Sequence, residues 1–256
     1  MEARRLGGDR AHRRPDPARR CRPGVRAEGD GASGRGDPRN AGPVRRDDGR
    51  GRYGPDDPPG AGEGLRQAAP RDDAAELLAA APLHAIAYGF TSSAYVIGME
   101  GEAEMIARLE RRTRGIPVVV TCGAAVEGLR VLGARRIALI DPPWFDTELN
   151  GLGARYYESA GFEVVYSSPC GLPSDQKKIA PAELHAWVSE RVSTTDAEAV
   201  VFGGNGFRAV GAIAALEEDL GRSVVTANQV LLWAALRMTD ADVRSVSDYG
   251  HLFSHD

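Results

Sequence analysis

The sequence predicts an α/β fold with parallel sheets flanked by helices, preceded by a disordered N-terminal tail, and three observations lead to this prediction. From about residue 73 onward, short apolar runs alternate with amphipathic helical runs. The apolar runs have no polar face, which is typical of strands that helices cover on both sides. Residues 1–72 differ, because Arg, Gly, Pro and Asp dominate them and no periodic apolar pattern would let them bury a core.

The composition of residues 1–72 leaves the origin of this segment open. Its balance is positive, but Asp is interspersed among the Arg and no aromatic ladder accompanies them, which argues against an arm that binds nucleic acid. Its residues are those with GC-rich codons, so a second hypothesis is DNA translated in the wrong frame, which would remove the first strands of the domain. A signal peptide is not expected, because a continuous apolar stretch is missing.

The first expected elements of the folded part are a short helix over 73–81 (DAAELLAAA) and an apolar strand over 83–90 (LHAIAYGF). Residues 101–114 predict the next helix, because their apolar residues share one face while Glu and Arg occupy the other. A glycine and a proline directly after this run end the helix.

The same alternation of strand and helix recurs along the rest of the chain. Each remaining strand is a short apolar run, and each remaining helix is a longer run between two of these strands. The strands are expected over 116–121, 136–140, 162–166, 197–202 and 223–226, and the helices over 124–132, 147–160, 181–192, 206–220 and 229–237.

The residues that follow the strands are the candidate ligand-binding residues, because α/β proteins bind ligands at the carboxyl ends of parallel strands. Most of these residues are small, hydroxylic or amide-bearing, and such groups suit a carboxylate, which needs several hydrogen-bond donors. Ordinary helix capping by Ser, Thr and Asn is the alternative. The groups are Thr91–Ser93, Thr121–Gly123, Asp141–Trp144, Ser168–Gly171, Gly203–Gly206 and Ala227–Gln229.

Several classes of function are excluded by missing motifs. The glycine-rich run Gly203–Gly206 does not match GxGxxG, and no GxxxxGK[ST], HExxH or paired CxxC occurs, so we expect neither a nucleotide cofactor nor a metal. No apolar stretch approaches a membrane span, and the acidic balance after residue 72 argues against a nucleic-acid groove. Cys21, Cys122 and Cys170 have no paired spacing and fit a reduced, cytoplasmic protein. A homo-oligomer is left open.

Cys122 and Arg208 are the two candidate residues whose roles the sequence leaves undecided. Cys122 follows a strand and precedes a helix, where the helix dipole would lower the thiol pKa, but a buried and inert thiol is the alternative. Arg208 would pair either with a substrate carboxylate or with a surface acid such as Glu217 or Glu218. Cys170 lies in a Pro/Gly loop and is less constrained.

Four blocks resemble the aspartate/glutamate racemase superfamily, and most of all its branch of maleate cis-trans isomerases and arylmalonate decarboxylases. They are YGFTSSAYVIG (88–98), the run 121–144 from TCGAAV to IDPPW, the run 200–237 from VVFGGNGFR to AALR, and YGHLF (249–253). The resemblance covers nearly everything after residue 73 and implies two similar α/β lobes with the substrate between them. The lobes would be 73–122 plus 222–256, which is incomplete, and 123–221.

The resemblance also implies a cofactor-independent enzyme that isomerises or decarboxylates a small mono- or dicarboxylate, similar to maleate or an arylmalonate, through an enediolate-type intermediate. In that family one or two cysteines at strand ends carry the protons. Here both positions have changed, to Phe90 and Gly204. A non-catalytic carboxylate binder or an inactive family member is therefore the alternative, and catalysis through Cys122 is a third possibility.

The site residues that the resemblance implies come from several strand ends. Thr91 and Ser92 would be carboxylate donors, and Gly204 with Asn205 would form a second loop that offers backbone N–H groups. Trp144 lies near the position of an aromatic hydroxyl in the family. Asn228 and Gln229 match a family motif whose role is less defined.

Overall fold

The computed structural model describes residues 69–239 and 241–255. The predicted tail therefore lies outside the described residues, apart from its last four positions. These four positions were assigned wrongly, because they form the first turn of helix α2 (Ala69–Leu78). The Arg108 guanidinium holds this turn with a salt bridge of 2.9 Å to Asp72, which is mostly buried.

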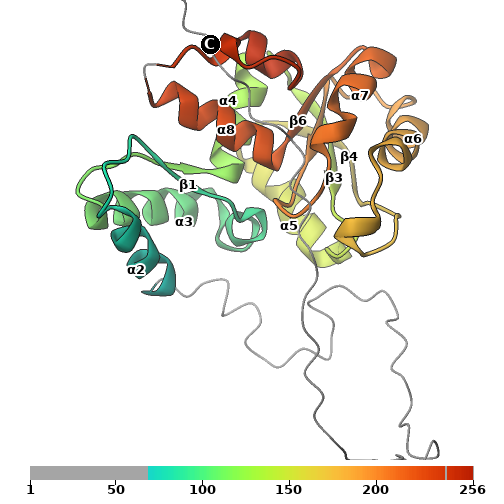
Figure 1. The fold of residues 1–256 in the computed structure, drawn as a ribbon. Helices are drawn as coiled ribbons and strands as arrows, with labels where there is room; N and C mark the ends of the chain where they lie inside the picture. The colour runs from blue at the N-terminus through green and yellow to red at the C-terminus, as the bar shows by residue number, and fades with distance from the viewer. Residues whose placement is uncertain (1–68, 240, 256) are drawn as a thin grey trace, which may run out of the picture. The chain divides into compact units, whose positions relative to one another are not determined.

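The strands form two parallel sheets, as the alternation of strand and helix predicts (Figure 1). The smaller sheet pairs β1 (Ile86–Tyr88) with β2 (Val118–Val120). The larger sheet has the order β4-β3-β5-β6, and every pairing in it is parallel. Its strands are β3 (Arg136–Asp141), β4 (Glu163–Pro169), β5 (Ala199–Phe202) and β6 (Ser223–Thr226).

The helices connect these strands, and three of them begin at the residue directly after a strand or one or two residues later. The α-helices that follow α2 are α3 (Thr91–Arg112), α4 (Thr121–Val131), α5 (Thr147–Ser159), α6 (Pro181–Val192), α7 (Ile213–Leu220) and α8 (Ala227–Arg237). Short 3-10 helices are η2 (Gln176–Lys178), η3 (Val210–Ala212), η4 (Val243–Ser245) and η5 (His251–Ser254).

Helix α3 begins ten residues before the predicted start at residue 101. The helical pattern was hidden because Gly98 interrupts the helix with φ of 71°, and the apolar residues before and after this kink do not share one face. Two further differences are smaller. Strand β4 runs to Pro169, so Ser168 lies inside a strand rather than after it, and residues 206–209 do not belong to the predicted helix over 206–220.

The assignment of residues to lobes is still a proposal, and the sheet pairing refines it. Strand β6 was placed with the first lobe, but it pairs with β5 in the larger sheet. Helix α8, which follows β6 directly, contacts both strands of the smaller sheet and packs along α4. The proposed division puts β6 and α8 in the same lobe, whereas β6 pairs within the larger sheet and α8 also contacts the smaller one, so the boundary at residue 222 stays a proposal.

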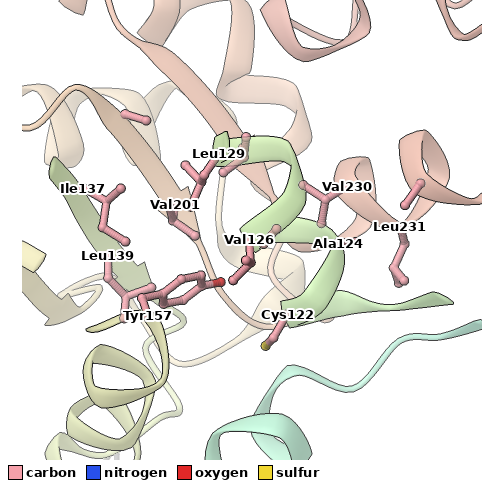
Figure 2. Packing of buried hydrophobic residues seen from close by; sticks show 14 of the residues in the cluster. Cys122, Ala124, Val126, Leu129, Ile137, Leu139, Tyr157, Val201, Val230 and Leu231 are labelled. Atoms are coloured by element: carbon pink, nitrogen blue, oxygen red, sulfur yellow. The ribbon is translucent and has the colours of Figure 1, made fainter. Parts of the chain in front are cut away.

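A hydrophobic cluster joins the two sheets through these helices (Figure 2). Val126 and Leu129 of α4 and Val230 of α8 pack together with Leu139 of β3 and Val201 of β5, and all of these side chains are buried. This shared core fixes the helix starts on the smaller sheet relative to the strand ends of the larger sheet. Among the described helices, none is long and apolar enough to cross a membrane.

Candidate active site

Hydroxyl and amide groups from four segments meet at the carboxyl ends of the strands, and Asn205 is their centre. Its Oδ1 accepts hydrogen bonds from the backbone N–H of Thr91 at 3.1 Å, from the Thr91 hydroxyl at 3.0 Å and from the Thr121 hydroxyl at 3.2 Å. Its Nδ2 donates to Asn228 Oδ1 at 3.0 Å, and Asn228 donates back to the Asn205 carbonyl. The expectation that these residues converge is confirmed.

These hydrogen bonds also occupy two of the expected carboxylate donors. The Gly204 N–H donates to Thr91 Oγ1 at 3.1 Å, and the Thr91 hydroxyl donates to Asn205. Neither group is free to bind a ligand without giving up a contact. Thr91 therefore positions the loop that follows β5, whereas the binding groups must be sought among its neighbours.

A cavity of about 140 Å³ lies beside this cluster, and the volume corresponds to about five water molecules at roughly 30 Å³ each. Thr91 and Ser92 at the start of α3 line one side, and Gly204, Asn205 and Gly206 line another. The remaining lining residues are Gly89, Phe90, Trp144, Phe145 and Gln176. None of these residues is acidic, so the cavity suits a small negatively charged molecule.

Ser92 is the buried hydroxyl of this cavity that has no partner among the described residues. Its exposed fraction is 3%, and it lies in the first turn of α3. In this turn the Thr91 N–H donates to Asn205 and the Ser93 N–H to the Phe90 carbonyl, whereas the Ser92 N–H has no partner among the described residues. An anion in the cavity would therefore receive hydrogen bonds from the Ser92 hydroxyl and from the start of the helix. The roles of Ser92 and Thr91 as carboxylate donors stay predictions.

Trp144 and Gln176 form the outer wall of the cavity. The Trp144 ring packs edge-on against Phe207, with ring centroids 6.0 Å apart, and this contact holds it beside the loop after β5. Gln176 belongs to the short helix η2, and its amide lies over Gly206, where a Cβ would come within 2.7 Å of Gln176 Nε2. Trp144 was expected here, but Gln176 was not.

Asp141 is a buried carboxyl beside Gly203, the residue that precedes Gly204 of the cavity. This carboxyl ends β3, is fully buried, and accepts hydrogen bonds from the Tyr95 hydroxyl at 3.1 Å and from Asn150 Nδ2 at 2.8 Å. A side chain at Gly203 would overlap Asp141 Oδ1, so only glycine fits above it. Burial raises the pKa of Asp141 to about 7, although both hydrogen bonds favour the ionised form.

A comparison with known protein families identifies the group to which the chain belongs. A sequence model of the arylmalonate decarboxylase family matches residues 68–253, which is most of the chain. The chain belongs to this family. No curated protein matches it.

Solved structures show that the chain shares the fold of this family. A maleate isomerase from Pseudomonas putida, in a cysteine-to-alanine form with maleate, has 24% identity and a TM-score of 0.68 over 75% of this chain and 79% of that chain. An arylmalonate decarboxylase has 22% identity and a TM-score of 0.66 over 72% and 81%. A maleate cis-trans isomerase from Nocardia farcinica with a covalently bound succinylcysteine intermediate has 24% identity and a TM-score of 0.67 over 75% and 80%.

Cys122 is the candidate thiol whose state the sequence left undecided. The thiol is fully buried beside α3, with Sγ 3.8 Å from the Thr91 carbonyl oxygen, and it does not line the cavity. Of the two alternatives that the sequence left open, the structure has the buried thiol, because burial and then the nearby carboxyls of Glu102 and Asp141 raise its pKa well above the usual value. Cys170 is buried as well, and burial raises its pKa.

Glu102 is a second buried carboxyl that the sequence did not single out. It accepts hydrogen bonds from the Tyr156 hydroxyl and the Gly123 N–H, so it joins α3 to α5 and to the first turn of α4. Burial raises its pKa to about 7. A buried acid on a predominantly charged helical face gives no pattern that distinguishes it from its exposed neighbours, which explains why it was missed.

Proposed function

We propose that this chain binds a small carboxylate in the 140 Å³ cavity and isomerises or decarboxylates it without a metal or organic cofactor. The observation that carries this proposal is the cavity itself, which lies between the start of α3 and the loop after β5 and has no acidic lining residue. Membership of the arylmalonate decarboxylase family supports the reaction class. The Pseudomonas putida structure, which contains maleate, supports the class of ligand.

The reaction needs groups that stabilise negative charge on a carboxylate oxygen. In a decarboxylation, the bond between the α-carbon and one carboxylate breaks, carbon dioxide leaves, and the electron pair moves into the remaining carboxylate to give an enediolate. A proton added to the α-carbon then completes the reaction. We assign charge stabilisation to the Ser92 hydroxyl, the Ser92 N–H and the Gln176 amide, while Thr91 and Asn205 hold the two sides of the cavity together.

The source of this proton is a separate question, because no cysteine, histidine, aspartate or glutamate lines the cavity. Water that enters beside Gln176, which is itself exposed, is one proton source consistent with this lining. The buried Cys122 thiol would have to deliver a proton across Thr91. We also propose a cytoplasmic location, because free thiols such as Cys122 are typical of a reducing compartment.

Proton NMR in deuterated water tests the proposal directly. The wild-type protein is incubated with maleate, aryl- and alkylmalonates and aspartate, and we expect isomerisation or decarboxylation of at least one acid with deuterium at the α-carbon. Ser92→Ala should lower turnover at least tenfold, because a donor to the developing charge is lost. Ser189→Ala, on α6 and outside the cavity, is the matched control.

A wild-type protein that binds these acids but converts none of them would refute the enzymatic proposal. The chain would then be a carboxylate binder without catalytic activity, as the loss of both family cysteine positions suggests. Binding measured by calorimetry on the same samples separates this result from a protein that does not recognise carboxylates at all.

A further inference from the structure

A second cavity of about 310 Å³ adjoins the candidate active site, and Asn205 and Gly206 line both cavities. Arg208 lies on the wall of this second cavity, is exposed, and makes no hydrogen bond or ion pair within the described part of the chain. Glu217, one of its expected surface partners, instead accepts hydrogen bonds from the N–H groups of Val224 and His251. The guanidinium is therefore available to a ligand.

The lining of this second cavity suits a short aliphatic chain that ends in an anion. Pro181, Phe207 and Val210 provide apolar walls, and Phe207 is buried behind them. No Asp or Glu lines either cavity, so nothing nearby competes for the guanidinium. A guanidinium presents paired N–H donors that match the oxygen atoms of a carboxylate.

Gly206 forms the boundary between the two cavities, and it is exposed. A Cβ at this position would lie 2.7 Å from Gln176 Nε2 and 3.4 Å from Trp144 Cζ2. The Gln176 amide and the Trp144 ring therefore lie directly over Gly206, and the two cavities meet where Asn205 and Gly206 line both of them. The two cavities can therefore hold two parts of one molecule.

We propose that Arg208 binds an anionic group at the end of a substituent on the substrate, separate from the carboxylates at the reacting carbon. The inference rests on the proposed function and narrows its substrate class to acids with a short carboxylated side chain. The methylene groups of this side chain would lie against Phe207 and Pro181, and its terminal carboxylate would meet the guanidinium. The reacting end would stay beside Ser92.

Two malonates with substituents of equal length test this inference. Calorimetry compares (2-carboxyethyl)malonate with n-propylmalonate on the wild type, Arg208→Gln and Arg208→Lys. We expect the wild type to prefer the carboxylated acid at least tenfold, Arg208→Gln to reduce this preference to within about twofold, and Arg208→Lys to keep part of it. Arg111→Gln is the matched control, because Arg111 is exposed on the last turn of α3, far along the helix from Thr91.

Two results would overturn the inference: a wild type without this preference, or an Arg208→Gln protein that keeps it. Proton NMR of the same samples reports on the proposed function separately. If the preference depends on Arg208 but neither acid is converted, the anion pocket stands and the enzymatic proposal fails. If acids are converted and Arg208→Gln behaves as the wild type does, the enzymatic proposal stands and the pocket fails.

Discussion

The resemblance aligns Gly204 with a family cysteine, but a side chain at this position would be strained. The Gly204 backbone has φ of 76°, a left-handed conformation that side chains disfavour. A Cβ there would also lie 2.6 Å from Pro142 Cγ. The proline ring cannot rotate away, because it is bonded to its own backbone nitrogen. The loop that contains Asn205 therefore has its present shape because position 204 has no side chain.

Gly204→Ala should lower the free energy of unfolding by about 2–4 kcal/mol, since backbone strain and the overlap with Pro142 both add to the cost. Urea unfolding followed by circular dichroism measures the change. Gly221→Ala separates the two causes, because Gly221 has φ of 61° but no atom within 4 Å of an added Cβ. Its cost should be about 1–2 kcal/mol. Equal losses in the two variants would contradict the role of Pro142.

Cys122→Ser should change turnover by less than about threefold, because the thiol is fully buried, does not line the cavity and stays protonated. In the native protein, Cys122 should also resist alkylation, which requires the thiolate. Mass spectrometry of alkylated peptides, with and without urea, follows each cysteine by itself. A tenfold loss of turnover in a folded Cys122→Ser protein would show instead that the thiol delivers the proton.

The sequence predicted those residues of the site that have polar side chains and directly follow a strand. Thr91, Thr121 and Asn205 were expected to meet because carboxyl ends of parallel strands share one edge. Gln176 was not predicted, because it lies on the short helix η2, which belongs to none of the elements expected from the sequence. Asp141 was noted only as the start of a strand-end group, and neither its burial nor its hydrogen bond to Tyr95 has a local sequence signal.

Most side chains of the candidate site lie in the first turns of helices. Where a helix follows a strand without a connecting loop, the end of the strand fixes the position of these side chains. Helices α4 and α8 begin at the residue after β2 and β6, so Thr121 and Asn228 are placed by the ends of strands rather than by flexible segments. The sequence predicted both helices, but with later starts, because residues such as Thr121 and Cys122 are poor helix formers and favour caps. Packing against the shared core overrides this local preference.

Helix α3 illustrates the limit of periodicity. The kink at Gly98 lets the first seven residues aim Ser92 at the cavity while the rest of the helix packs along the smaller sheet through Met105 and Leu109. A single apolar stripe cannot describe both parts, because the kink rotates one face relative to the other. The second part was predicted, whereas the first part, which carries Ser92, was not assigned to a helix.

At the level of the whole molecule, the alternation of strand and helix predicted parallel sheets, but it could not assign strands to sheets. Most of the described strands are short and apolar, so β6 has no feature that distinguishes a partner in the smaller sheet from one in the larger sheet. Its pairing with β5 depends on tertiary contacts. One such contact is the buried Glu217, which accepts the N–H of Val224 in β6.

The buried acids give the whole molecule a distinct dependence of stability on pH. Burial is the main cause that raises the pKa of Asp141 from 3.8 to about 7 and that of Glu102 from 4.5 to about 7. Between about pH 4 and 7 the folded protein therefore holds protons that the unfolded chain has released. The free energy of unfolding then falls as pH rises through this window, and it levels off above pH 7 as far as these two groups are concerned.

Urea unfolding at pH 5, 6, 7 and 8 should show this decline between pH 5 and 7, with a slope that approaches 1.4 kcal/mol per pH unit for each bound proton. Asp141→Asn and Glu102→Gln should each remove about half of the slope, because each replaces one of the two groups that titrate. Glu158→Gln, at an exposed position of α5, is the control and should leave the slope unchanged. A stability that stays constant or increases from pH 5 to 7 would mean that both carboxyls are ionised inside the fold. The Tyr95 and Tyr156 hydroxyls would then stabilise buried charge more strongly than burial disfavours it.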